Sequence, residues 1–127
     1  MLTIINTDLY LTRGDSAYLS IDVESQECRC SKPYNFTKGE KLYFTVKKNV
    51  RAKDFLFQKV YDSDVDGLPE NNVVTFKISP EDTEALSFGK YMYDVELVTA
   101  NKDKFTIIKP SLFEVLSEVT YSINEGE

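Results

Sequence analysis

Three aspartates at alternate positions are the clearest candidates for chemistry in this chain. Asp62, Asp64 and Asp66 precede Gly67, which is the spacing that opens a calcium-binding loop. Calcium takes oxygen ligands, and a glycine permits the sharp turn around the ion. The twelfth position of such a loop is Val73 and not glutamate, which excludes an EF-hand. We favour a solvated acidic turn over a calcium site, because half of a motif is a weak signal, and we therefore expect no cofactor.

The tripeptide Arg13-Gly14-Asp15 matches a sequence that some integrin ligands present. Recognition would require it to protrude on a flexible loop. Here it joins two short apolar segments within very few residues, so we interpret it as a tight turn.

Cys28-Arg29-Cys30 contains both cysteines of the chain. A disulfide between residues two apart would close a strained ring, and a zinc site would need two further ligands in a chain without histidine. We expect reduced thiols in a loop.

Catalysis is not expected from the composition. The 21 acidic residues could supply a general acid and base, but nothing in their spacing selects a pair. The absence of histidine removes the commonest general base, and no nucleophile elbow or phosphate-binding glycine loop occurs. We predict that the protein is not an enzyme.

The length and net charge of the chain limit its number of domains and its classes of partner. The 127 residues predict a single domain, 1–127. The net charge of -6 disfavours nucleic acid and anionic membranes as partners. No apolar run is long enough to span a membrane, and the N-terminus lacks the pattern of a signal peptide, so we expect a soluble protein made in the cytosol.

Short runs with a period of two predict an all-β fold of about seven strands. The first run is interrupted and has two parts, residues 2–7 and 9–12. Residues 25–40 and 62–71 are predicted to be loops. A sandwich of two sheets is the expected architecture, with a closed barrel as its rival. The expected strands are residues 2–7 with 9–12, 17–23, 42–46, 55–61, 74–78, 89–99 and 105–115.

The segment from Ser79 onward gives the most specific prediction of architecture. Ser79 and Pro80 begin a short helical turn, expected over residues 80–85, and Gly89 starts a strand with Tyr91 and Tyr93 on one side. A helical turn followed by a strand with tyrosine near its start is typical of immunoglobulin-like antiparallel sandwiches.

Tyr18, Tyr43 and Met92 are expected to point outward from their strands. Aromatic residues and methionine are enriched at the centres of protein interfaces, so these three are the candidate interaction residues. The alternative is that they are exposed singly, which is common on protein surfaces.

The order of these segments resembles a known family. The chain is similar, over residues 9–120, to the N-terminal immunoglobulin-like domain of baseplate upper proteins and related tail accessory proteins of Firmicutes phages and prophages. It departs from them in its two cysteines and in stopping near the end of the domain, which favours a free-standing protein or an excised domain. The matching segments are residues 11–17, 39–48, 56–59, 78–83, 89–97 and 105–108.

The resemblance implies a virion structural protein that docks onto other tail or baseplate proteins, or onto a second copy of itself, without catalysis. It also implies a location in the virion or in the cytoplasm of the bacterial host. The alternative function is a carbohydrate- or host-receptor-binding sandwich, because outward aromatic residues can also form a sugar-binding platform.

Overall fold

The computed structural model describes residues 2–27, 30–69 and 73–117, and in this part of the chain the fold is all-β, as predicted. The strands are β1 (Leu2–Ile5), β2 (Asp8–Thr12), β3 (Ala17–Asp22), β4 (Glu24–Glu27), β5 (Cys30–Pro33), β6 (Lys41–Lys47), β7 (Phe57–Asp62), β8 (Val73–Ile78), β9 (Gly89–Val98) and β10 (Lys104–Leu116). Two short helices, α1 (Ser63–Asp66) and α2 (Pro80–Glu84), lie between them. Neither helix in the described part is long and apolar enough to cross a membrane.

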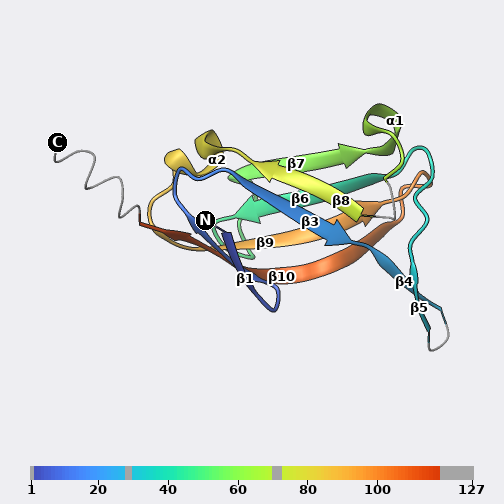
Figure 1. Cartoon of the computed structure of the whole chain (residues 1–127), viewed down its shortest axis with the longest axis horizontal. Coiled ribbons are helices and arrows are strands. Elements are labelled where there is room, and N and C mark those ends of the chain that lie inside the picture. Colours follow the sequence, from blue (N-terminus) through green and yellow to red (C-terminus); the bar gives the residue numbers. More distant parts are fainter. Residues whose placement is uncertain (1, 28–29, 70–72, 118–127) are drawn as a thin grey trace.

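The strands build a sandwich of two unequal sheets (Figure 1). Six strands form one sheet in the order β1-β2-β10-β9-β6-β7, and β3 pairs with β8 in the second. All neighbours are antiparallel except β2 and β10, which pair in parallel. The groups β3–β8 and β6–β9–β10 correspond to the B–E and C–F–G strands of an immunoglobulin-like sandwich. The larger sheet ends at β1 and β7, so it does not close into a barrel.

The core lies between the sheets, and Phe44 is at its centre. Its ring centroid is 5.3 Å from that of Tyr93, 5.9 Å from Phe76 of the opposite sheet and 6.5 Å from Phe113. Burying one such ring contributes about 1.5–3 kcal/mol, so this cluster ties the sheets together. The buried apolar residues are Leu9, Leu11, Ala17, Leu19, Ile21, Val23, Phe36, Leu42, Phe44, Val46, Tyr61, Val74, Phe76, Ile78, Tyr93, Val95, Leu97, Phe113 and Val115.

The helical turn α2 and the strand after it confirm the most specific prediction. Pro80 is the first helical residue, and the Asp82 carboxylate accepts a hydrogen bond from the backbone N–H of Ser79 at 2.7 Å. In β9 the Tyr91 hydroxyl donates to the carbonyl of Ser87 at 2.7 Å. This bond back to the preceding backbone is the tyrosine corner of immunoglobulin-like domains.

The Arg13-Gly14-Asp15 segment is the turn between β2 and β3, as predicted. Gly14 has a φ of 84°, and its N–H donates to the buried hydroxyl of Thr83 at 2.9 Å. The guanidinium of Arg13 lies 4.5 Å from the centroid of the Phe88 ring. These contacts bind the turn to the segment around α2.

Residues 25–40 were predicted to be a loop, and this prediction is wrong for their first part. Strands β4 and β5 form an antiparallel hairpin beside the sandwich (Figure 1). Its sequence is polar and lacks the apolar alternation that indicates the other strands. Cys28 and Arg29 lie outside the described residues, as does the side chain of Cys30, so the prediction for these thiols stays a prediction.

The run of residues 55–61 has apolar residues in both registers, and the structure shows which side of β7 faces the core. Phe57, Lys59 and Tyr61 lie on the core side, since Phe57 packs on the core and Tyr61 is buried. The ammonium of Lys59 reaches the carboxylate of Asp82 at 2.7 Å. β7 is an edge strand of the larger sheet. Its outer face also carries an apolar residue, Val60, which is half exposed.

The last strand pairs irregularly near its centre. In β10 the register with β9 shifts between Thr106 and Ile108 and again between Ile108 and Ser111, next to Pro110. Proline has no N–H to donate, so the chain bulges and then resumes with Phe113 and Val115 facing the core.

Candidate docking surfaces

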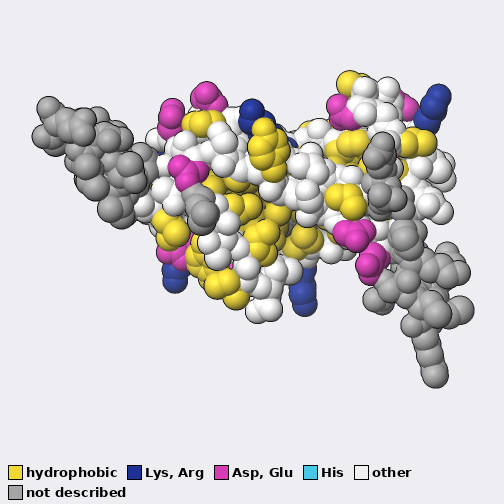
Figure 2. Space-filling view, viewed as in Figure 1, with side chains coloured by type: hydrophobic (Ala, Val, Ile, Leu, Met, Phe, Trp, Pro, Cys, Tyr) yellow, Lys and Arg dark blue, Asp and Glu magenta, His cyan; other side chains and the backbone are white. Residues whose placement is uncertain are grey.

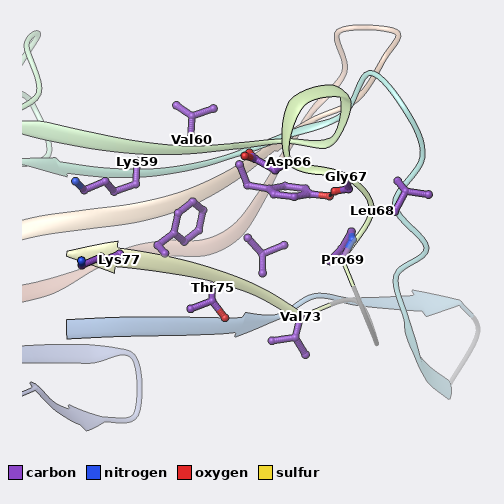
Figure 3. A pocket seen from close by; sticks show the side chains of 12 residues that line it. Lys59, Val60, Asp66, Gly67, Leu68, Pro69, Val73, Thr75 and Lys77 are labelled. Atoms are coloured by element: carbon purple, nitrogen blue, oxygen red, sulfur yellow. Dashed lines mark hydrogen bonds between the residues drawn. The ribbon is translucent and has the colours of Figure 1, made fainter. Parts of the chain in front are cut away.

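A groove runs between β7 and β8, on the side where the two sheets stand apart (Figure 3). Its volume is about 470 Å³. Strand β7 is the last strand of the larger sheet, and β8 has β3 on one side only, so no described strand pairs with either on the groove side. Unpaired strand edges present backbone N–H and C=O groups that can bond an added strand.

The lining of the groove is mixed, with charged and polar side chains beside apolar ones. Leu68 is 57% exposed and Pro69 lies beside it, whereas the side chain of Val60, 45% exposed, points away from β8 (Figure 3). The hydroxyl of Tyr61 donates to the carbonyl of Gly67, which holds this segment at the mouth of the groove. Burial raises the pKa of Tyr61, and the charge of Asp66 adds to the rise, so this hydroxyl stays a donor at neutral pH.

Opposite charges lie at the two ends of the groove. Lys59 and Lys77 are at one end and Asp66 is at the other (Figure 3). Lys59 is engaged with Asp82, and an inward charge on an edge strand opposes uncontrolled pairing with other chains. The groove therefore suits an extended segment whose charges match its ends better than an arbitrary strand.

The three aspartates of the calcium hypothesis lie in α1 and at its start. Residues 62–71 were predicted to be a loop, so the helical turn Ser63–Asp66 corrects that prediction, and α2 is not the only helical turn. Asp62 caps α1 by accepting the N–H of Asp64 at 2.9 Å, and Asp66 accepts the N–H of Asp62 at 2.9 Å. Asp64 accepts the N–H of Gly39 at 3.0 Å.

Each of these carboxylates thus satisfies a backbone amide of a helix end or a neighbouring loop. In the described part of the chain, no three carboxylate, thiol or imidazole groups are placed to share a metal ion. Asp62 also lies 3.8 Å from the ammonium of Lys41. The preference for an acidic turn over a calcium site stays a prediction.

The candidate interaction residues lie on opposite faces of the sandwich. Tyr18 on β3 is 66% exposed on the smaller sheet. Tyr43 on β6 and Met92 on β9 are half-buried on the outer face of the larger sheet. Because the core lies between these faces, Tyr18 cannot share one contact surface with Tyr43 and Met92.

Apolar side chains are also exposed away from the groove. Figure 2 shows them gathered beside β3 on the face in view. On β1, at the other end of the larger sheet, Ile4 and Ile5 are 52% and 55% exposed. Ile4 pairs with the buried Leu9 and so lies on the core side, but the two-stranded sheet is too narrow to cover it.

A buried glutamate lies next to α1. Glu40 is 4% exposed and accepts hydrogen bonds from the N–H of Thr37, at 2.8 Å, and from the hydroxyl of Tyr34. Its backbone N–H donates to the hydroxyl of Ser63 at 3.0 Å. Burial, with the hydrogen bond and charge of Glu40, raises the pKa of Tyr34 to about 12.

Sequence reasoning missed Leu68 and Glu40. Leu68 and Pro69 follow the acidic run directly, and apolar residues in an otherwise acidic loop are the signal that could have indicated a contact surface. Glu40 precedes the alternating run of β6, and no pattern distinguishes it from the exposed acids around it.

No family model, no curated protein and no solved structure matches the chain. The geometry above and the resemblance noted in the sequence are what bear on its function.

Proposed function

We propose that this chain is a structural protein of a phage or prophage, a docking module of the tail or baseplate that acts through protein–protein contacts and not by catalysis. The resemblance of residues 9–120 to tail accessory domains supports this role. The observation that carries it is the groove between β7 and β8, where two unpaired strand edges lie beside an exposed apolar side chain, that of Leu68. We expect the protein in the virion or in the cytoplasm of the bacterial host.

The groove favours a particular mode of docking. An extended segment of a partner would bond the backbone of β8 on its unpaired side and widen the two-stranded sheet. Its apolar side chains would contact Leu68 and Pro69, and its charged ends would face Lys77 and Asp66. Backbone bonds would supply affinity, and the side-chain contacts would supply specificity.

A pull-down against the tail and baseplate proteins encoded beside this chain tests the proposal. We expect retention of at least one of them by the wild-type chain and weakened retention by Leu68→Asp, which replaces an exposed apolar side chain at the mouth of the groove by a charge. Val65→Asp is the matched control, because Val65 is 80% exposed on α1 and does not line the groove. Retention of none of these proteins, or equal loss in both variants, would contradict the proposal.

A carbohydrate- or host-receptor-binding module is the second candidate. The observation in its favour is that Tyr43 lies in a hollow with Gln58 and Glu96, a mixture of an aromatic ring and polar groups. Retention on a cell-wall polysaccharide column without binding to any tail protein would favour this class.

A further inference from the structure

The outer face of the six-stranded sheet has a hollow of its own, separate from the mouth of the groove at Leu68. Its volume is about 310 Å³, within the range of small-ligand sites. It is lined by Tyr43, Thr45, Gln58, Glu96, Val98 and Lys104.

The register of the sheet brings these residues together from four strands. Tyr43 on β6 lies opposite Glu96 on β9, and Thr45 lies opposite Gln58 on β7. Lys104 on β10 pairs with Val98 and so completes the rim. Antiparallel partners have their side chains on the same face and close together, so the hollow follows from the strand pairing.

The floor of the hollow is fixed by a hydrogen bond. The Gln58 side-chain N–H donates to the hydroxyl of Thr45 at 2.8 Å, and Thr45 is only 9% exposed although it points away from the core. This bond uses one N–H of the Gln58 amide, whose side chain carries a second N–H and a carbonyl oxygen. The half-buried ring of Tyr43 forms an apolar wall beside it.

The charges around the hollow balance. Glu96 and Lys104 line it, while Asp94 lies next to Glu96 on the same face of β9, with Lys47 nearby. Burial raises the pKa of Asp94, the charge of Glu96 adds to the rise, and Lys47 opposes it. Two acids and two bases leave no excess charge, so the site favours neither a phosphate nor a cation.

We propose that this hollow binds a neutral saccharide, stacked on Tyr43 and hydrogen-bonded by Gln58, Glu96 and Lys104. Sugar hydroxyl groups both donate and accept, which matches an acceptor-only carboxylate, a donor-only ammonium and an amide that does both. The apolar face of a sugar ring fits an aromatic wall. The proposal rests on the second candidate function, for which it names the ligand class, and it does not depend on the docking function, because Leu68 lines the groove and not this hollow.

Titration of the ¹⁵N-labelled chain with glucose, galactose and N-acetylglucosamine tests the proposal. We expect the amide signals of Tyr43, Thr45, Gln58 and Glu96 to shift and to saturate with at least one of these sugars. Glucosamine and glucose 6-phosphate, which carry opposite charges, should bind more weakly than the neutral sugars.

Matched tyrosine variants locate the site. Tyr43→Ala should weaken binding about tenfold, since it removes the ring contact, whereas Tyr43→Phe should retain it. Tyr18→Ala changes a more exposed tyrosine on the opposite sheet and should leave binding unchanged. Absence of shifts at these residues with every neutral sugar, tighter binding of a charged sugar, or equal losses in Tyr43→Ala and Tyr18→Ala would overturn the proposal.

Discussion

Replacing Glu40 by alanine removes the carboxylate that holds together the loop before β6. Its two oxygens accept hydrogen bonds from the N–H of Thr37 and the hydroxyl of Tyr34. The backbone links between Glu40 and Ser63, at 3.0 Å in each direction, remain after the change. The variant therefore isolates the contribution of the side chain.

The expected loss follows from the bonds that are broken. A hydrogen bond to a charged group contributes about 1.5–3 kcal/mol, and a buried donor left without a partner adds to the loss. Tyr34 is only half-buried, so water can satisfy its hydroxyl in part. We therefore expect Glu40→Ala to lower the free energy of unfolding by about 2–4 kcal/mol.

Urea unfolding followed by far-ultraviolet circular dichroism measures this loss. Tyr34→Phe should lose less than Glu40→Ala, because the bond from Thr37 remains, and the two losses should not add in the double variant. Glu84→Ala, an exposed glutamate on α2, is the control and should change stability by less than about 0.5 kcal/mol. If Glu40→Ala were as stable as Glu84→Ala, the buried carboxylate would not fix this loop.

Three further changes test other parts of the structure. Leu97→Asp should lower the free energy of unfolding by at least about 3 kcal/mol in the same urea assay, because Leu97 is 2% exposed and the new charge would have no partner. A loss near zero would place Leu97 outside the core. Thermal melts with millimolar calcium and with chelator should coincide, since Asp64 already accepts a backbone N–H. A rise in melting temperature with calcium that Asp64→Ala abolishes would reveal a metal site. Burial raises the pKa of Tyr34 and of Tyr93 to about 12 from 10.0, so their contribution to stability should be complete below about pH 10 and be lost as the pH rises toward 12. The urea midpoint should fall over this interval, and less steeply in Tyr34→Phe; an identical fall would assign the effect to other groups.

Local patterns predicted the strands that have one buried face. The alternation of β9, with Val95 and Leu97 inside, and the start of α2 at Pro80 depend on neighbours within a few residues. The helical turn α1 was missed because its stability comes from capping by Asp62 and from contacts with a loop far away in the sequence, including the bond from Gly39 to Asp64. Hairpin β4–β5 was missed because its sequence has no apolar face to indicate a strand.

The candidate sites depend on which strands become neighbours. Tyr18 and Tyr43 have the same outward pattern in the sequence, yet they lie on opposite sheets. The inward direction of Lys59 could not be read from a strand with apolar residues in both registers, and only the partner Asp82 on α2 explains it. The groove and the hollow are products of strand order, which alternation does not specify.

Hydrogen–deuterium exchange of the chain, alone and mixed with each tail and baseplate protein encoded beside it, tests the docking role most directly. If a partner segment adds to the groove, amides of β8 and β7 should exchange more slowly in the mixture, whereas those of β1 at the opposite end of the sheet should not change. The Leu68→Asp variant should lose this protection and Val65→Asp should keep it. Unchanged exchange in β7 and β8 with every one of these proteins, or protection confined to other strands, would contradict docking at the groove.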